Sequence, residues 1–126
     1  MKAILDTSVL LATNVAELEG ELAISAASLA ELHFGVLVTA DAAIRAERLR
    51  RLSDLLRNFD ALPVDDEVAA SYGQLAAAVA GSGRQPRSRV MDLLIAATAH
   101  AHAAHLYTRN AADLVGIEHL VDIVAV

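Results

Sequence analysis

The sequence predicts an α/β fold in which helices cover both faces of a parallel β-sheet. Short apolar runs alternate along the chain with longer segments of helical periodicity, and this alternation is typical of parallel strands joined by helices. The length of 126 residues suits a single domain over residues 1–126. We find no internal repeat and no low-complexity segment, which also favours one domain.

Five short apolar runs are the expected strands: residues 3–5, 22–25, 59–64, 105–108 and 121–124. The first of them ends directly at Asp6. Pro63 has no N–H to donate to a neighbouring strand, so the third strand should lie at an edge of the sheet. Because the first apolar run ends at Asp6, we expect polar residues immediately beyond the ends of the strands.

Five segments are the expected helices: residues within 7–21, 26–38, 41–58, a segment opened by 65–67, and 88–103. Leu29, Leu32 and Val36 share one face of the second helix. Asp65, Asp66 and Glu67 place negative charge where a helix dipole favours it. Ser88 is the expected cap of the fifth helix, and Gly81–Pro86 is the expected loop before it.

Composition narrows the class of function. The net charge of −6 argues against a protein that coats nucleic acid, since phosphate contacts need Lys and Arg. It remains compatible with a nuclease whose carboxylates hold metal ions. The absence of cysteine excludes disulfides and thiolate metal sites and favours a reducing cytoplasm. We expect no signal peptide and no membrane span, because every uncharged apolar run is too short.

Four acidic residues stand apart from the other charges: Asp6, Glu31, Asp92 and Asp113. Asp6 and Asp113 follow strands, Glu31 lies early in the helix after the second strand, and Asp92 lies near the start of the fifth helix. The alternating topology brings all of these positions to the carboxyl end of the sheet. Crowded carboxylates repel one another and raise each other's pKa values, and a hard cation such as Mg²⁺ or Mn²⁺ relieves this. Metal-assisted phosphodiester hydrolysis is the chemistry that such a site favours.

Each acid taken alone also has an ordinary structural explanation. Asp6 could cap the helix that follows it, and Glu31 could be a solvated helix charge. Asp92 could be a partner of a helix dipole and Asp113 an acid in a loop. The occurrence of all four at one end of the sheet favours a shared metal site.

Four motifs, in order along nearly the whole chain, resemble PIN-domain toxins of the VapC type: Leu-Asp-Thr-Ser-Val-Leu, Ile-Ser-Ala-Ala-Ser-Leu-Ala-Glu-Leu, Asp-Leu-Leu-Ile-Ala-Ala-Thr-Ala and Leu-Tyr-Thr-Arg-Asn-Ala-Ala-Asp-Leu. The resemblance implies a three-layer α/β/α fold with strand order 3-2-1-4-5. It matches Asp6, Glu31, Asp92 and Asp113 to the family's catalytic acids, with Asp6, Asp92 and Asp113 as metal ligands. It also implies a bacterial ribonuclease that binds Mg²⁺ or Mn²⁺, forms a homodimer and is inhibited by a small antitoxin.

Ser8, Arg109 and Asn110 flank the expected site and are our candidates for contacting substrate. For Arg109 and Asn110, which lie between the fourth strand and Asp113, a phosphate-binding and a structural role are equally compatible with the sequence. The arginines within residues 45–57 are expected to form a solvated helix face, with contact to RNA or antitoxin as the alternative.

The histidines at 100, 102 and 105 do not share one helix face, so we expect surface or interface residues rather than metal ligands. Two other classes of protein stay open at this point. A haloacid-dehalogenase-like phosphatase would use Asp6 as its nucleophile, but such enzymes generally have a second Asp two positions later, where this chain has Ser8. A non-catalytic PIN-like binding module would tolerate the loss of acids, and none is missing.

Overall fold

A computed structural model describes residues 1–12 and 15–126 and contains a five-stranded sheet. Its strands are β1 (Lys2–Leu5), β2 (Glu21–Ser25), β3 (Ala61–Leu62), β4 (His105–Thr108) and β5 (Ile123–Ala125). All neighbouring strands pair in parallel in the order β3-β2-β1-β4-β5. The predicted strand order is confirmed, and β3 lies at an edge, as Pro63 indicated.

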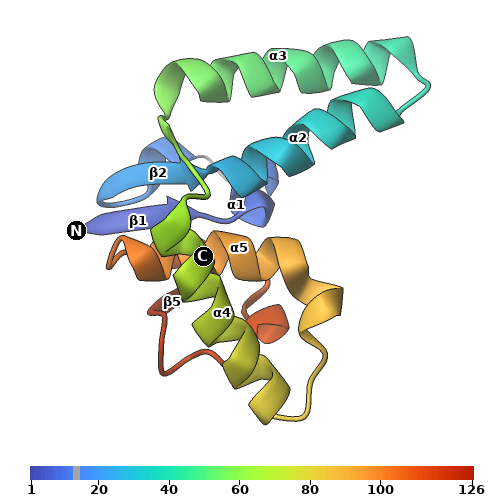
Figure 1. Cartoon of the computed structure of the whole chain (residues 1–126). Coiled ribbons are helices and arrows are strands. Elements are labelled where there is room, and N and C mark those ends of the chain that lie inside the picture. The colour runs from blue at the N-terminus through green and yellow to red at the C-terminus, as the bar shows by residue number, and fades with distance from the viewer. Residues whose placement is uncertain (13–14) are drawn as a thin grey trace.

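Helices pack on both faces of this sheet (Figure 1). They are α1 (Thr7–Ala12), α2 (Ala26–Val38), α3 (Ala42–Asn58), α4 (Asp66–Gly81) and α5 (Val90–Ala101), with 3₁₀ turns η1 (Val15–Glu17), η2 (Pro86–Arg89) and η3 (Ala111–Leu114). In Figure 1, α2 and α3 form one antiparallel pair above the sheet, and α4 and α5 lie below it. Within the described residues, no helix is long and apolar enough to cross a membrane.

The alternation of side chains along β1 divides the core between the two faces. Ile4 packs in one cluster with residues of α4 and α5, including Leu75 and Ile95. Ala3 and Leu5 point the other way and pack in a second cluster with residues of α1 and α3. Successive side chains of a strand point to opposite faces, so a single buried strand joins both layers.

Short polar side chains begin the helices that follow the strands. The hydroxyl of Ser25 accepts a hydrogen bond of 3.1 Å from the N–H of Ala27 at the start of α2. Asp65 accepts one of 3.0 Å from the N–H of Val68 in α4. Such caps satisfy N–H groups that a helix leaves unpaired. The carboxyl ends of strands and the starts of helices therefore coincide at one end of the sheet.

Several boundaries differ from the sequence prediction. The third strand is limited to Ala61–Leu62, because Pro63 follows it directly and cannot extend the ladder. Only α1 and η1 lie within the described part of the expected helix 7–21, and Thr13 and Asn14 fall outside the described residues. The fifth strand begins two residues later than expected, at Ile123.

The prediction that Ser88 caps the fifth helix is wrong. Ser88 lies inside η2, and its hydroxyl donates a 2.9 Å hydrogen bond to the carbonyl of Gln85. The helix instead begins at Val90, after Arg89, which provides no side-chain cap. Pro86 favours the turn because its fixed φ suits the first position of a helix. The true start of α5 places Asp92 in the first turn.

Leu75→Ala is expected to lower the free energy of unfolding by about 3 kcal/mol, because Leu75 is fully buried and its truncation leaves a cavity. Leu49→Ala, at a position that is 52% exposed, is the matched control and should change it by less than about 0.5 kcal/mol. Urea denaturation followed by circular dichroism measures both. Equal losses in the two variants would contradict the assigned core.

Candidate active site

Asp6 is the most buried of the four predicted acids, at 7% exposure. Its carboxylate accepts hydrogen bonds of 2.8 Å from the hydroxyl of Ser8 and 2.8 Å from the hydroxyl of Thr108. The N–H of Thr7 donates a third, of 2.9 Å. These donors come from the start of α1 and the end of β4, so Asp6 both begins α1 and lies among polar groups. Capping and a functional role are therefore compatible.

Glu31 is joined to the Asp6 region through Thr7. The hydroxyl of Thr7 lies 2.7 Å from a carboxylate oxygen of Glu31 and 3.1 Å from the hydroxyl of Ser28. Glu31 is half-buried on α2. Because Thr7 follows Asp6 directly, this contact fixes the start of α2 against the end of β1.

Asp92 and Asp113 meet at the same end of the sheet through Arg89. The guanidinium of Arg89 lies 3.2 Å from a carboxylate oxygen of Asp113 and 3.9 Å from one of Asp92. The first distance is a charge-assisted hydrogen bond, and the second is a looser ionic contact. Both carboxylates remain partly open to solvent, with 40% of the Asp113 side chain and 33% of the Asp92 side chain exposed.

Burial raises the pKa of Asp92 above its usual value, and the negative charges of Asp6, Glu31 and Asp113 raise that pKa further. Arg89 opposes these effects and lowers the pKa of Asp92. All three other acids thus act on Asp92 electrostatically, as expected for one cluster of like charges. The four positions that the sequence singled out converge.

The candidates for contacting substrate lie next to Asp6. The hydroxyl of Ser8, which donates to Asp6, accepts a 3.1 Å hydrogen bond from the backbone N–H of Arg109. The N–H of Asn110 donates to the hydroxyl of Thr108 at 3.0 Å. The side chains of Arg109 and Asn110 are on exposed residues. Ser8 therefore orients Asp6, while residues 109–110 border the site.

Sequence reasoning missed three residues of this arrangement: Thr7, Thr108 and Arg89. Thr7 stands inside a motif that drew attention for its acid alone. Arg89 precedes Asp92 by three residues, and this i,i+3 spacing of opposite charges was a usable signal. Thr108 gave no signal, because its partner Asp6 is 102 residues away along the chain.

The donor chemistry of the cluster fits a hard divalent cation, since all four predicted residues are carboxylates. In residues 1–12 and 15–126, however, no three carboxylate or histidine side chains lie close enough to form a ready ligand set. A cation would thus have to draw the acids together. Asp6, Asp92 and Asp113, which the resemblance implies as metal ligands, are the residues that would have to hold it, and this assignment stays a prediction.

The histidines and the arginines of α3 lie outside this cluster. His100 is half-buried and hydrogen-bonded to Ser71 at 2.8 Å, and His105 contacts Asp122. Within the described residues, His100 and His105 form no common metal site, although both are less exposed than expected. Arg45 and Arg48 donate to the carbonyls of Thr39 and Gly35, each at 2.7 Å. Part of the expected solvated arginine face is therefore used to hold α3 against the end of α2.

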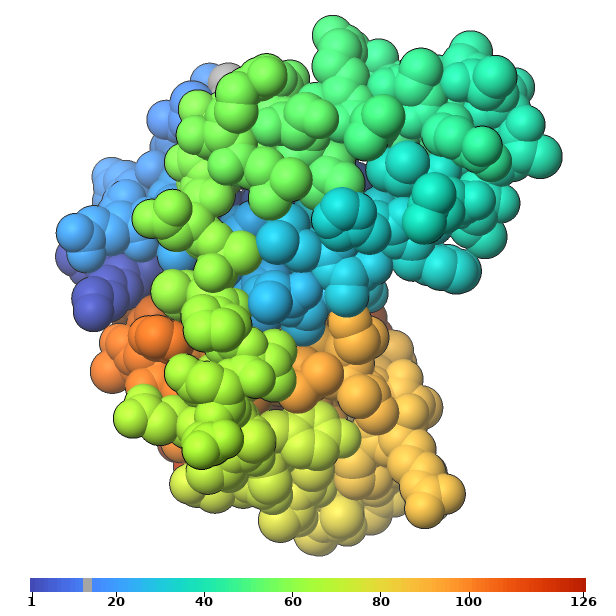
Figure 2. Space-filling view, turned by 45° about the horizontal axis from the view of Figure 1, so that its top comes forward, coloured from blue at the N-terminus to red at the C-terminus, as the bar shows by residue number. Residues whose placement is uncertain are grey.

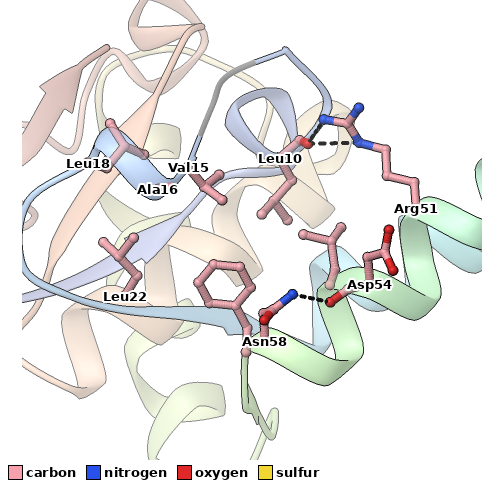
Figure 3. A pocket seen from close by; sticks show the side chains of 10 residues that line it. Leu10, Val15, Ala16, Leu18, Leu22, Arg51, Asp54 and Asn58 are labelled. Atoms are coloured by element: carbon pink, nitrogen blue, oxygen red, sulfur yellow. Dashed lines mark hydrogen bonds between the residues drawn. The ribbon is translucent and has the colours of Figure 1, made fainter.

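A pocket of about 570 Å³ lies between η1, β2 and α3, and none of the four predicted acids lines it (Figure 3). Figure 3 shows Leu10, Val15 and Leu22 on one side of it and Asp54 and Asn58 on α3 across from them. The guanidinium of Arg51 donates to the carbonyl of Leu10 at its rim. The pocket is mostly apolar and holds none of the predicted acids, so its size alone does not mark the functional site.

Known proteins resemble this chain over most of its length. Residues 3–112 match the family model described as PIN domain. The ribonuclease VapC5 of Mycobacterium tuberculosis is 39% identical over 113 residues, which are 85% of this chain and 82% of that protein. The ribonuclease VapC8 of the same species is 36% identical over 100 residues, 76% of this chain and 88% of that protein.

A solved structure is similar in fold as well as in sequence. The crystal structure of VapBC-5 from Mycobacterium tuberculosis, a member of the VapBC family of toxin–antitoxin systems, superposes with a TM-score of 0.81 at 34% identity. The match covers 99% of this chain and 97% of the chain in that structure.

Asp92→Asn is expected to raise the melting temperature of the metal-free protein by a few degrees at pH 7. A carboxyl whose pKa is raised by folding favours the folded state below its ordinary pKa of 3.8, and this contribution is lost as pH rises through the raised value. Asn is neutral at every pH, so the difference from wild type should vanish in acid. Thermal melting in a chelator between pH 3 and pH 8 tests this, with the exposed Asp60→Asn as control. A variant that melts below wild type at pH 7 would refute it.

Proposed function

This chain belongs to the PIN-domain family, and we propose that it is a Mg²⁺- or Mn²⁺-dependent endoribonuclease, the toxin of a type II toxin–antitoxin pair. The relatives named above are ribonucleases of the VapC type. The observation that carries the proposal is the placement of four acids at one end of the sheet. Thr7 links Asp6 to Glu31, Arg89 links Asp92 to Asp113, and Glu31 and Asp92 line one hollow. A cluster of this kind is stable at neutral pH when positive charge is brought to it.

Each acid has a distinct part in the proposed reaction. Asp6 is held by the hydroxyls of Ser8 and Thr108, so its orientation is fixed before substrate arrives. Asp92 and Asp113, which are partly exposed, can turn toward an ion. Bound Mg²⁺ or Mn²⁺ would supply an activated water and stabilise the leaving oxygen of the phosphodiester.

Glu31 lies on α2, opposite the helix start that carries Asp92. Its contact with the hydroxyl of Thr7 fixes its distance from Asp6. Glu31 and Asp92 line the same hollow, so from this position Glu31 can accept a proton from a water that attacks the phosphate.

The two other classes raised by the sequence have less support. Membership of the PIN family argues against the haloacid-dehalogenase-like phosphatase. In addition, Ser8 stands where those enzymes generally have a second Asp, and its hydroxyl donates a hydrogen bond to Asp6. A non-catalytic module of the same fold would not need to keep all four acids, and all four are present. Hydrolysis of RNA remains the better-supported function.

Asp92→Asn should lower RNA cleavage by at least about a hundredfold, because it removes a charge that helps to hold the cation and organise the reacting groups. Cleavage of single-stranded RNA by the purified protein, with Mg²⁺ or Mn²⁺ and with a chelator, measures this. The chelator should abolish wild-type cleavage, and Asp60→Asn should cleave as wild type does. Full cleavage by Asp92→Asn, or by wild type in the chelator, would disprove the proposed site.

We further propose a small antitoxin as partner, because the solved relative is a toxin–antitoxin protein. An apolar pocket of about 290 Å³ opens beside Glu31 and is lined by Leu11, Leu32 and Leu52. An apolar segment of the antitoxin can fill this pocket while an arginine of the antitoxin reaches the acids. The resemblance also implies a homodimer, which stays a prediction.

Replacing that antitoxin arginine with Ala should weaken inhibition, and excess Mg²⁺ should partly relieve inhibition by the wild-type antitoxin. Both effects follow if a guanidinium and a cation compete for the same carboxylates. The measurement is RNA cleavage by the purified pair over a range of Mg²⁺ concentrations, with the protein encoded next to this one as partner. Equal inhibition by both antitoxins at every Mg²⁺ concentration would exclude the competition.

A further inference from the structure

Arg89 stands between two of the four acids without belonging to the set that the sequence identified. It ends η2 and immediately precedes α5. Its guanidinium reaches Asp113 at 3.2 Å and Asp92 at 3.9 Å, while 45% of its side chain is exposed. The nearer contact is to Asp113 in η3, and the guanidinium makes a longer contact with Asp92 in α5.

Two hollows meet at Arg89. One, of about 260 Å³, is lined by Arg84, Ser88, Arg89 and Asp113 among others. The other, of about 300 Å³, is lined by Glu31, Arg87, Arg89 and Asp92 among others. Figure 2 shows the surface hollowed between α2 and the segment that leads into α5. Arg89 therefore lies where the two hollows meet, and each hollow is lined by at least one of the four acids and by one further arginine.

Arg89 contacts the same two carboxylates that a divalent cation would bind. A guanidinium bound to Asp92 and Asp113 supplies positive charge to the acids, and a divalent ion held by the same carboxylates would compete for their oxygens. A released guanidinium would still be next to the site. Arginine binds phosphate in a bidentate manner, and one further arginine lines each of the two hollows beside Arg89, Arg84 in the first and Arg87 in the second.

We propose that Arg89 is a phosphate-binding residue that is released by the cation: it pairs with Asp113 and Asp92 while the site holds no divalent ion, and it turns to an RNA phosphate once an ion takes those carboxylates. The inference rests on the proposed ribonuclease function. It makes the binding of cation and RNA mutually favourable, since each event favours the released position of Arg89.

Arg89→Gln should bind Mn²⁺ about fivefold more tightly than wild type, because a competing, partly exposed charge is removed from the carboxylates. Arg87→Gln is the matched control: it removes the same charge from the same turn, but its side chain has no ion pair with an acid in the described residues. It should change the affinity by less than about twofold. Arg89→Lys, which keeps the charge but not the planar fork, should stay within about twofold of wild type. Titration calorimetry with MnCl₂ measures all four proteins.

The second measurement is the KM for a single-stranded RNA at saturating Mn²⁺. Arg89→Gln should raise KM about fivefold or more, since it removes a phosphate contact, and should change kcat by a smaller factor. One variant would thus bind the cation more tightly and RNA more weakly. A purely structural role of Arg89 predicts the opposite for the cation, because a loosened site binds Mn²⁺ less well.

Mn²⁺ affinity that is unchanged or weaker in Arg89→Gln would overturn the proposal, and so would an unchanged KM. If wild type still cleaves RNA with Mn²⁺, the ribonuclease function stands after such a result. If wild type neither binds Mn²⁺ nor cleaves RNA, both proposals fall together. The role of Arg89 is supported if Arg89→Gln combines tighter Mn²⁺ binding with a raised KM.

Discussion

The burial of the Asp6 carboxylate at the end of β1 is the constraint on which the rest of the site depends. A buried charge is expensive unless it is hydrogen-bonded, and Asp6 receives its three donors from Thr7, Ser8 and Thr108. These donors can converge only if α1 starts directly after β1 and β4 lies beside it. The register of β1 with β4 pairs Leu5 with Tyr107, which brings Thr108 level with Asp6. One buried charge therefore sets the end of the central strands.

A second acidic layer is built around this fixed carboxylate from elements that are less constrained. Glu31 is held through Thr7, whereas Asp92 and Asp113 are partly exposed and share Arg89. Burial, and after it the negative charges of Asp6, Glu31 and Asp113, raise the pKa of Asp92, so the ionised form of Asp92 is disfavoured in this cluster. The fold thus holds a cluster that positive charge stabilises. Arg89 supplies such charge in this structure, and the proposed divalent ion and the proposed antitoxin arginine would supply it to the same carboxylates.

The arginines of α3 show how the same residue type serves a different purpose elsewhere. Arg45 and Arg48 bind backbone carbonyls at the end of α2, and Arg51 binds the carbonyl of Leu10 at the end of α1. Helices leave their last carbonyls unpaired, and the long side chain of an arginine on a neighbouring helix can reach them and donate hydrogen bonds. A sequence pattern of clustered arginines fits an RNA surface, a partner surface and this structural use alike, because the partners are distant in sequence.

The sequence by itself predicted the alternation of strands and helices, the edge position of β3 and the placement of Asp6, Glu31, Asp92 and Asp113 at one end of the sheet. Periodicity is a local property, and the carboxyl ends of parallel strands meet at one edge of a sheet. The resemblance to PIN-domain toxins supplied the full strand order. Only the tertiary structure decided which side chains hold the acids. Thr108 and Asp6 are 102 residues apart, and Thr7 and Glu31 are 24 apart. The 3.2 Å contact between Arg89 and Asp113 likewise depends on how η3 packs against the start of α5, which no local pattern encodes.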